Sequence, residues 1–517
     1  MITSSDKAFE SLDTAPLRAA IEIGLARLGD KAAYHKLDAR MEREASLSGA
    51  TLRELAIALA SDLGARAPSF RRVAIVTPSG PEFLVAMLAC IYAGLECVAP
   101  PFPSPGPTKK RFEKIMTGCE PDCVLAAGED IPDLTEELEA IGLEKTTMVA
   151  IGMSPSSLDL NEAFNKLPDR DCRILQYTSG TSGSPRAVVL TGANVAANAE
   201  LTVRSWELTA DDSMLTWLPH HHDMGLFGCI ITPMVVGGPI HQMSPFTFLK
   251  RPSRWMEAVF HTRATLTGGP AFAMRLAIEA RGSIDELDLS CVRGVFCGSE
   301  PIAPDLLERF AAHFKTAGLS PKAPFSCYGL AESTLYVAGR PGGGLTAACK
   351  IFDDSLHSVC IVDPHDRTLV QDGCEGEVWV AGPSVAETYL DAPDESTATF
   401  GGRLNGAQNV NWLKTGDLGR IDGDALLVSG RIKDMIIVNG ANVPAAEIEW
   451  TAINTDPVFD GMAACCFAYG ALDEGRAALV VEVEKRAARD LEIDATCQRI
   501  RAAVRTAHSV DLTDIII

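Results

Sequence analysis

Hydrophobic residues near the start of the chain recur with a helical period. Over residues 51–64 they return every three to four positions, which is typical of an amphipathic helix. The leucines on its apolar face are Leu52, Leu55, Leu59 and Leu63. Thr51 and Glu54 have the spacing of a capping box, and Gly64 is a helix-ending residue. The pattern therefore predicts a helix that begins after Thr51 and ends at Gly64.

Short apolar runs flank a second, more hydrophobic helix. Residues 73–76 and 123–127 have the pattern of buried strands, and residues 79–82 mark the start of a helix between them. This helix carries the longest apolar run of the chain, residues 83–95, and should stop at Gly94. Strands that alternate with helices predict a parallel sheet with helices on its faces, so the expected fold class is α/β.

The pattern changes in the last third of the chain. From about residue 377 the sequence consists of short strands separated by turns. After Gly430 it predicts a strand at 435–438, a helix at 445–453 and a further strand at 479–483. We therefore expect two domains, an N-terminal domain over residues 1–430 and a smaller C-terminal domain over residues 431–517.

Composition and charge narrow the range of partners. The 517 residues include 68 acidic and 46 basic side chains, which gives a formal net charge of −22. This charge argues against non-specific binding to nucleic acid or to an anionic membrane, because both need a positive field. A membrane span needs about twenty apolar residues, more than the longest run offers, so none is expected.

The start of the chain and its cysteines indicate the compartment. The first residues lack the basic start and apolar stretch of a signal peptide. The fifteen cysteines have no regular spacing and form no Cys-x-x-Cys pair. Free thiols in a reducing environment are expected, and with them a cytoplasmic location.

A loop rich in glycine and hydroxyl groups is the strongest local signal of chemistry. Residues 178–183 combine hydroxyl side chains with two glycines, so the loop can wrap closely around phosphate oxygens, and Arg186 could add positive charge. A Walker loop is excluded, because the chain contains no Gly-Lys dipeptide. Composition alone favours a flexible surface turn over a phosphate-binding loop.

Other candidate residues also have structural alternatives. Three histidines precede Asp223 and could form a metal site, although neighbours on an extended chain point in opposite directions. Asp417 follows a glycine and could be a turn residue. Glu332 could be a solvated carboxylate at a helix start. These residues gain a functional interpretation only from the order in which their motifs occur.

Five motifs, in order, resemble the signatures of the adenylate-forming superfamily, which includes acyl-CoA synthetases, luciferases, peptide-synthetase adenylation domains and fatty acyl-AMP ligases. The first is the loop just described. The others are Leu218-Pro219-x-x-His222-Asp223-Met224-Gly225, Gly298-Ser299-Glu300-Pro301, Tyr328-Gly329-Leu330-Ala331-Glu332, and Thr415-Gly416-Asp417 with Gly430-Arg431-Ile432-Lys433-Asp434. The second and fourth are most similar to fatty acyl-AMP ligases. The resemblance covers roughly residues 20–500.

The resemblance implies a fold and a set of nucleotide-binding residues. The fold would be α/β, with stacked sheets and a small β-barrel-like subdomain in the N-terminal domain and an incomplete α+β C-terminal lid. ATP and Mg²⁺ would be the cofactors. The phosphates would be held by Thr178, Ser179, Gly180, Thr181, Ser182 and Gly183. Adenine would be held by Ser299, Glu300, Pro301, Tyr328, Gly329 and Leu330, and the ribose by Asp417 and Arg431.

The resemblance also assigns roles to residues around the reacting groups. Thr181 and Glu332 would hold Mg²⁺, a hard ion that suits one carboxylate, phosphate oxygens and water. Lys433 would be the hinge about which the small domain rotates. Residues with expected catalytic roles are Thr181, Arg186, His222 and Glu332. Residues expected to contact the acyl substrate are His222, which would gate its carboxylate, Asp223, Met224, Gly225 and Gly298.

Three departures from the family pattern bear on these expectations. Ala187 stands where a glycine usually follows the basic residue. The segment over residues 336–350 is shorter than the insertion that fatty acyl-AMP ligases carry and that is associated with rejecting coenzyme A. The family's C-terminal Ser-Gly-Lys is missing, since Lys485 is the last lysine and the chain ends inside an apparent strand. We interpret this as truncation, the alternative being a natural loss, and expect adenylate formation by this chain to be slow.

These features favour one function and leave two alternatives. The expected enzyme activates a carboxylic acid, most plausibly a fatty acid, to acyl-AMP with release of pyrophosphate, and transfers the acyl group to an acyl carrier protein. An acyl-CoA synthetase is the first alternative, favoured by the short insertion. A non-catalytic relative that binds nucleotide or acyl-adenylate is the second, favoured by the missing lysine.

Overall fold

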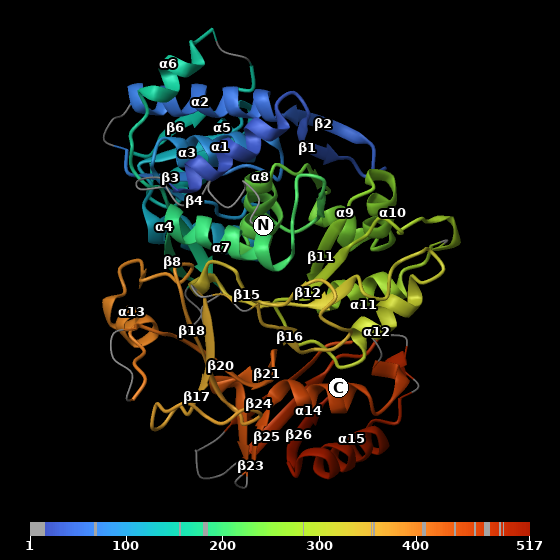
Figure 1. The fold of residues 1–517 in the computed structure, drawn as a ribbon. Helices are drawn as coiled ribbons and strands as arrows, with labels where there is room; N and C mark the ends of the chain where they lie inside the picture. The colour runs from blue at the N-terminus through green and yellow to red at the C-terminus, as the bar shows by residue number, and fades with distance from the viewer. Residues whose placement is uncertain are drawn as a thin grey trace, which may run out of the picture.

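The computed structural model describes most of the chain and shows a layered α/β architecture (Figure 1). The described residues are 16–66, 70–154, 157–178, 185–282, 284–352, 354, 357–405, 410–438, 441–459, 462–469, 476–484, 487–489 and 491–517. The helices are α1 (Pro16–Leu28), α2 (Gly49–Arg66), α3 (Pro81–Tyr92), α4 (Pro107–Cys119), α5 (Ile131–Ala140), α6 (Leu160–Asn165), α7 (Gly192–Ser205), α8 (Thr232–Val236), α9 (Pro245–Lys250), α10 (Ser253–Thr262), α11 (Ala271–Glu279), α12 (Leu306–His313), α13 (Pro393–Phe400), α14 (Ala445–Ile453) and α15 (Ile493–His508).

One sheet carries the predicted strand–helix–strand unit. Its order is β19 (Thr388–Tyr389), β8 (Arg186–Thr191), β7 (Arg173–Thr178), β4 (Glu96–Val98), β3 (Arg72–Ile75), β5 (Cys123–Ala126) and β6 (Thr147–Ala150). The strands from β7 to β6 are parallel, while β8 pairs antiparallel with β7. Val73 and Ile75 face one apolar core, and Ala74 and Val76 face another with α4 and α5. Both faces of this sheet are therefore buried, as a parallel sheet requires.

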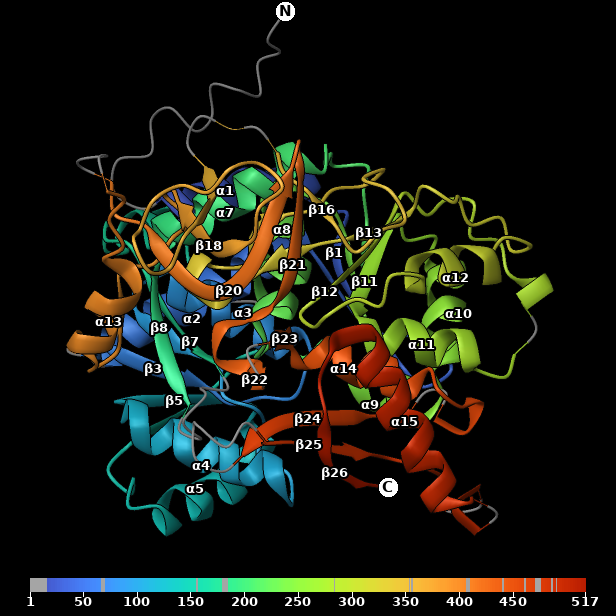
Figure 2. The same ribbon diagram turned by 90° about the horizontal axis from the view of Figure 1, so that it is seen from below.

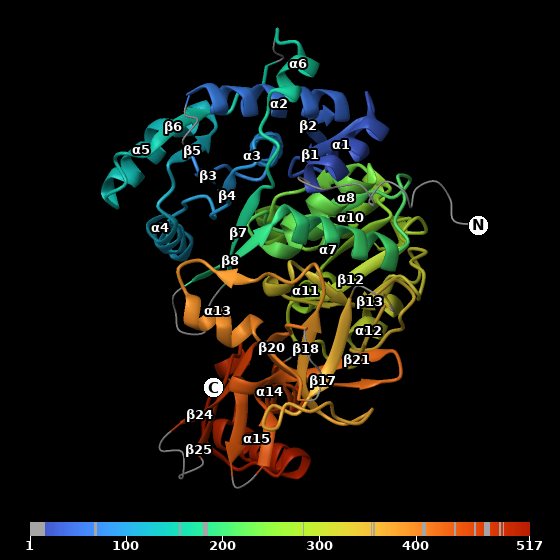
Figure 3. The ribbon, with the colours of Figure 1, turned by 60° about the vertical axis from the view of Figure 1, so that its left-hand side comes forward.

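A second sheet lies beside the first, with α1, α3, α7 and α8 between them (Figure 3). Its order is β13 (Pro324–Ser326), β12 (Gly294–Gly298), β11 (Leu266–Pro270), β9 (Met214–Thr216), β10 (Ile240–Gln242), β1 (Ala32–Leu37) and β2 (Arg43–Ser48). Helices α10, α11 and α12 cover its outer face through a core that includes Trp255, Met274 and Phe310. The stacked sheets expected for the N-terminal domain are thus confirmed.

A third sheet is antiparallel and joins the two larger sheets to the end of the chain. Its order is β16 (Cys349–Lys350), β21 (Ala425–Arg431), β20 (Leu413–Asp422), β18 (Gly376–Ala381) and β17 (Ser358–Val362). Two short pairs accompany it: β14 (Tyr328–Gly329) with β15 (Tyr336–Ala338), and β22 (Met435–Val438) with β23 (Ala441–Pro444). This is the small β subdomain that the sequence predicts.

The last residues form a core of their own. Strands β24 (Ala464–Tyr469), β25 (Arg476–Val481) and β26 (Leu512–Ile516) make one sheet, against which α14 and α15 pack (Figure 2). The chain therefore does end in a strand. Arg499, Arg501 and Arg505 on α15 bond to Asp456, to the carbonyls of Leu512 and Thr513, and to Asp511. The proposed boundary at residue 430 falls near the end of β21 and remains a proposal.

Most local predictions are confirmed, but one helix and one strand differ. The strand predicted at 479–483 lies earlier, as β25 over Arg476–Val481. Helix α3 and strands β3 and β5 lie where the hydrophobic pattern predicts them, and α14 covers residues 445–453 as expected. The capping box at Thr51 is wrong, because α2 begins at Gly49 and continues beyond Gly64. Ser48 caps this helix instead, since its Oγ accepts a hydrogen bond from Thr51 N–H at 3.1 Å. None of the helices in the described ranges is long and apolar enough to cross a membrane.

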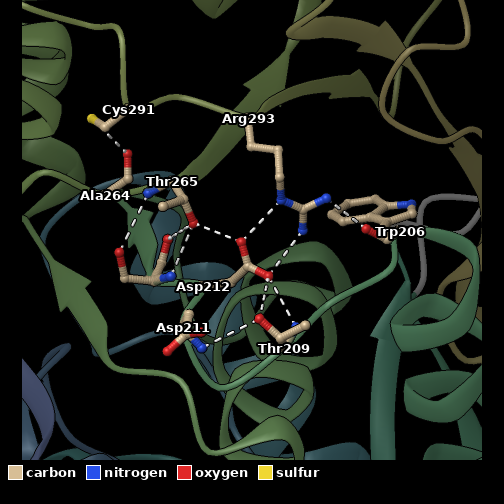
Figure 4. A network of polar contacts seen from close by, with 9 residues as sticks. Trp206, Thr209, Asp211, Asp212, Ala264, Thr265, Cys291 and Arg293 are labelled. Atoms are coloured by element: carbon tan, nitrogen blue, oxygen red, sulfur yellow. Dashed lines mark hydrogen bonds and ion pairs between the residues drawn. The ribbon is translucent and has the colours of Figure 1, made fainter.

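A polar network fixes the end of α7 to the second sheet (Figure 4). Arg293, which precedes β12, donates from Nε and Nη2 to the two carboxylate oxygens of Asp212, both at 3.0 Å. Its Nη1 donates to the Trp206 carbonyl at 2.8 Å. Thr209 N–H and Thr265 Oγ1 also donate to the Asp212 carboxylate, at 2.9 and 3.0 Å. The bidentate pair therefore positions Trp206, which lines a cavity described below.

Replacing Asp212 by Asn should lower the free energy of unfolding by about 1–2 kcal/mol, because a paired guanidinium loses its counter-charge at a partly exposed site. Urea unfolding should show a lower midpoint with an unchanged slope. Asp211→Asn, which makes the same charge change at an exposed neighbour, is the control and should leave the midpoint unchanged. Equal effects of the two substitutions would contradict the assigned role of the pair.

Candidate active site

The ends of several strands from the two large sheets meet the third sheet. Strand β7 ends at Thr178, β9 leads to the histidine segment, and β12 ends at the Gly298 turn. In parallel sheets, the carboxyl ends of the strands are where ligands bind. The predicted motifs are thereby gathered at one edge of the fold.

The predicted phosphate loop connects two antiparallel strands. Thr178 pairs with Arg186 across β7 and β8, and its Oγ1 lies 3.5 Å from the Arg186 carbonyl. The remaining predicted phosphate-binding residues lie outside the described residues; they are Ser179, Gly180, Thr181, Ser182 and Gly183. The structure thus places both ends of the loop side by side.

Arg186, which follows the loop, is linked through Tyr389 to Glu332, the predicted metal-binding carboxylate. Its Nη1 pairs with Glu395 Oε2 at 2.9 Å, and its guanidinium carbon lies 5.5 Å from the centre of the Tyr389 ring. The Tyr389 hydroxyl donates to Glu332 Oε1 at 2.7 Å. Burial, followed by the charge of Glu332, raises the pKa of Tyr389, so this hydroxyl stays protonated at neutral pH. Arg186 and Glu332, separated in sequence, are thus linked through one tyrosine.

The predicted adenine turn is held in a strained conformation. Ser299 has a φ of +69°, which non-glycine residues rarely adopt. A side chain at Gly298 would place Cβ 2.6 Å from the Cys327 carbonyl, so the position requires glycine. Glu300 Oε1 accepts a short hydrogen bond from Phe272 N–H. Pro301 follows directly, so the predicted turn lies at the end of β12 beside Tyr328.

The next predicted nucleotide-binding residues form one hydrogen-bonded group. The Tyr328 hydroxyl donates to Asp417 Oδ2 at 2.6 Å, and Arg431 Nε lies 3.0 Å from Asp417 Oδ1. Burial raises the pKa of Asp417, and the Arg431 guanidinium opposes that rise. Gly329 must be glycine, because a Cβ there would lie 1.9 Å from the Leu335 carbonyl, and Leu330 N–H bonds to that same carbonyl at 2.9 Å. The structure therefore brings the adenine and ribose candidates together.

Lys433, the predicted hinge, also faces this group. It lies in the short helix η5 (Ile432–Asp434) directly after β21. Burial and the neighbouring Arg431 lower the pKa of Lys433, and Arg186 and Asp417 are close enough to act on the same ammonium. The hinge candidate therefore lies near both the ribose candidate Asp417 and Arg186.

The three histidines differ in exposure: His220 is buried, His221 is half-buried and His222 is exposed. Burial is the main reason that the pKa of His220 falls to about 3, that of His221 to about 2 and that of His222 to about 4. His220 stacks on Phe83 with ring centres 3.8 Å apart, and its Nδ1 lies 2.9 Å from Ser79 Oγ. Near neutral pH these rings therefore carry no positive charge.

His220 should make folding stability pH-dependent. A neutral buried ring resists protonation, whereas in the unfolded chain histidine takes up a proton near pH 6.5, so stability is lost as the pH falls below that value. One such group costs about 2 kcal/mol by pH 5. Between pH 7 and pH 5 the free energy of unfolding should fall in both proteins. We expect this fall to be about 1–2 kcal/mol smaller in His220→Gln than in the unsubstituted protein.

Urea unfolding at the two pH values measures this difference. His261→Gln, at an exposed histidine, should behave like the unsubstituted protein. If the losses of stability of the His220 variant and the unsubstituted protein were equal, the neutral form of His220 would not contribute to folding.

The residues after the histidines begin a buried π-helical segment, η2 (Met224–Ile231). Asp223 Oδ1 accepts from Met224 N–H at 2.7 Å. Burial raises the pKa of Asp223 to about 6, and the nearby Glu332 charge contributes to the rise. Gly225 packs so closely that a Cβ would lie 2.2 Å from the Pro219 carbonyl. Segments of this type occur often at functional sites.

A small cavity, of about 40 Å³, is lined both by nucleotide candidates and by apolar side chains. Asp223, Ser299 and Tyr328 lie at its polar part. Its apolar lining includes Trp206, Phe296, Leu335 and Tyr336. A larger cavity, of about 550 Å³, lies between α2 and α6 and is lined by none of the predicted site residues. We therefore take the smaller cavity as the candidate substrate site.

The donor groups suit Mg²⁺ better than a transition metal. In the part of the chain that the structure describes, no three His, Cys, Asp or Glu side chains form a metal-binding group. Mg²⁺ needs no such group, since one carboxylate with phosphate oxygens and water can fill its octahedron. Glu332 is a single carboxylate, linked through Tyr389 to Arg186.

The sequence did not reveal a residue that fixes the Glu332 turn. Asn198 on α7 is buried, and its Nδ2 donates to the carbonyls of Ser333 and Tyr336 at 3.1 and 2.9 Å. Its Oδ1 accepts from Tyr336 N–H at 3.1 Å. Thr334 has a φ of +66°, so this turn is strained and needs such support. No local sequence signal marks Asn198, and the same holds for Tyr389 and for Arg111, discussed below.

Comparison with known proteins gives a consistent result. The profile of the AMP-binding enzyme family matches residues 22–390. The chain is 30% identical to the medium-chain-fatty-acid–[acyl-carrier-protein] ligase JamA of Moorena producens, over 91% of this chain and 86% of that protein. It is 29% identical to the long-chain-fatty-acid–AMP ligase FadD28 of Mycobacterium tuberculosis, over 86% and 83% of the two chains. A fatty acyl-adenylate ligase from L. pneumophila, solved with acyl adenylate and pyrophosphate, superposes with a TM-score of 0.74 at 28% identity, over 98% of this chain and 92% of that one.

Proposed function

The chain belongs to the AMP-binding enzyme family, and from this premise we propose that it is a fatty acyl-AMP ligase that passes its product to an acyl carrier protein. It would join a fatty acid to ATP, forming acyl-AMP and pyrophosphate. The observation that carries the proposal is that Tyr328 and Asp223 line one small cavity together with the apolar side chains of Trp206 and Phe296. An acyl-adenylate needs both environments at one site.

The described residues can hold the nucleotide. Asp417 would accept hydrogen bonds from the ribose hydroxyls, and its existing bonds to Tyr328 and Arg431 hold the carboxylate in place. Tyr328 and the Ser299 turn would bind adenine. Each of these side chains is fixed before the ligand arrives, which reduces the entropy lost on binding.

Around the reacting atoms, the residues would position the acid and screen charge. His222 would orient the acid carboxylate for in-line attack on the α-phosphorus. Because its ring is neutral, it would not protonate the attacking carboxylate. Glu332 and Thr181 would hold Mg²⁺, which when bound stabilises negative charge on the phosphates. The reaction needs no nucleophile from the protein, so positioning and electrostatics account for the catalysis.

The acyl acceptor is inferred from the relatives, and one observation favours an alternative acceptor. The relatives JamA and TtuA are named as ligases of acyl carrier protein, which supports a carrier protein here. The short segment between β15 and β16 favours coenzyme A instead, because fatty acyl-AMP ligases carry a longer insertion there. A comparison of the two acceptors decides between them.

The test is acid-dependent exchange of pyrophosphate into ATP with fatty acids of graded length. We expect exchange that requires both the acid and Mg²⁺. Adding a holo acyl carrier protein or coenzyme A to the preformed adenylate should then give acyl transfer to the carrier protein. Transfer to coenzyme A alone would establish the alternative, and a lack of exchange with every acid would overturn the proposed reaction.

A further inference from the structure

One half-buried cation at the end of β7 has no counter-charge among the described residues. Arg111 lies on α4, and its Nε is buried without a hydrogen-bond partner. Its Nη2 makes a long contact, 3.4 Å, with the Tyr177 carbonyl. Burying part of a guanidinium without a counter-charge costs free energy that a bound anion would offset. In a chain of net charge −22, such a cation invites a functional explanation.

The position of Arg111 is fixed by packing. Phe112, Ile115 and Met116 on the same helix share an apolar core with Leu175 and Tyr177 of β7. This packing holds the Arg111 guanidinium at the end of β7. Tyr177 is the residue directly before Thr178, where the predicted phosphate loop begins. Arg111 therefore lies at the base of that loop, although it is distant from it in sequence.

The histidine segment lies against the same end of β7. Gln176 Nε2 donates to the His221 carbonyl at 3.1 Å. His221 and His222 are close enough to Arg111 for its charge to lower the pKa of both rings, in addition to the larger effect of burial. Because these rings are neutral near pH 7, Arg111 is the permanent positive charge of this group. A planar guanidinium can also donate to two oxygens of one phosphate, which a lysine cannot do.

We propose that Arg111 binds the β- and γ-phosphates of ATP, and hence pyrophosphate, at the base of the loop. This inference rests on the proposed function, because it takes the loop to be the phosphate site. The position directly before Thr178 favours phosphate over the acid carboxylate, the other oxyanion that the site would receive. The unpaired Nε would find its acceptor in the ligand.

Calorimetric binding of Mg²⁺-pyrophosphate and of AMP tests the proposal directly. Arg111→Met should weaken pyrophosphate binding by about 10–100-fold, the loss expected for charge-assisted bonds, with AMP affinity changed by less than about twofold. Arg111→Lys keeps the charge but not the fork and should weaken pyrophosphate binding by about threefold to tenfold. Lys110→Met makes the same charge change at an exposed neighbour on α4 and should leave both affinities unchanged.

Several results would overturn the proposal. Unchanged pyrophosphate affinity in folded Arg111→Met, or an increase only in the KM for the fatty acid, would place Arg111 outside the phosphate site. An equal loss of AMP and pyrophosphate affinity would show a general disturbance of the pocket. If Arg111→Met does not fold, unchanged pyrophosphate affinity in Arg111→Lys has the same consequence. Failure of the proposed function can be distinguished from failure of the Arg111 proposal. In the first case the unsubstituted protein would show no acid-dependent exchange, while its binding of pyrophosphate could still be measured.

Discussion

Glu332→Gln should lower acid-dependent ATP–pyrophosphate exchange by about a thousandfold or more while leaving the fold intact. A carboxylate that holds Mg²⁺ supports several kcal/mol of charge stabilisation on the phosphates, and each 1.4 kcal/mol is about tenfold in rate. Glutamine is similar in size, and its amide oxygen can still accept the Tyr389 hydroxyl that Glu332 accepts at 2.7 Å. The loss should therefore come from the missing charge.

The control for this substitution is Glu387→Gln. Glu387 is exposed on the neighbouring segment, so the same charge is removed without touching the site. Its exchange rate should match that of the unsubstituted protein. The Glu332 variant should also show a thermal midpoint close to normal. Near-normal Mg²⁺-dependent exchange by a folded Glu332→Gln protein would rule out the metal role.

Asp417→Ala should weaken ATP binding by about 10–100-fold. A carboxylate that accepts two ribose hydroxyls makes charge-assisted bonds of about 1.5–3 kcal/mol. The substitution also leaves the Tyr328 hydroxyl and Arg431 without the partner that the structure shows for each. Pyrophosphate affinity should hold, because the phosphate loop lies at the other end of the nucleotide.

Titration calorimetry with ATP and pyrophosphate measures both expectations. Asp417→Asn, which keeps the shape but not the charge, should lose less affinity than Asp417→Ala. Asp422→Ala, at the exposed end of β20, is the control and should bind ATP normally. Unchanged ATP affinity in Asp417→Ala would mean that the ribose site lies elsewhere.

The sequence alone determined the fold class and most of the elements, because hydrophobic periods and glycines act over a few residues. The α14 helix at 445–453 and the strands that flank α3 follow from such local patterns. The start of α2 could not be predicted in this way, since two residues three positions apart, Ser48 and Thr51, can each cap a helix. Only the folded chain shows that Ser48 accepts the Thr51 N–H.

The order of motifs likewise determined the family and the residues to examine, but not how they meet. Tyr328 and Asp417 are 89 positions apart, and their hydrogen bond exists because the β14 strand and the third sheet pack together. Asn198, Tyr389 and Arg111 carry no local signal at all. The first two hold the Glu332 turn and carboxylate from α7 and β19, and Arg111 on α4 contacts the Tyr177 carbonyl in β7. Which way a helical or strand side chain points depends on the partner it packs against, and that partner is chosen by the tertiary structure.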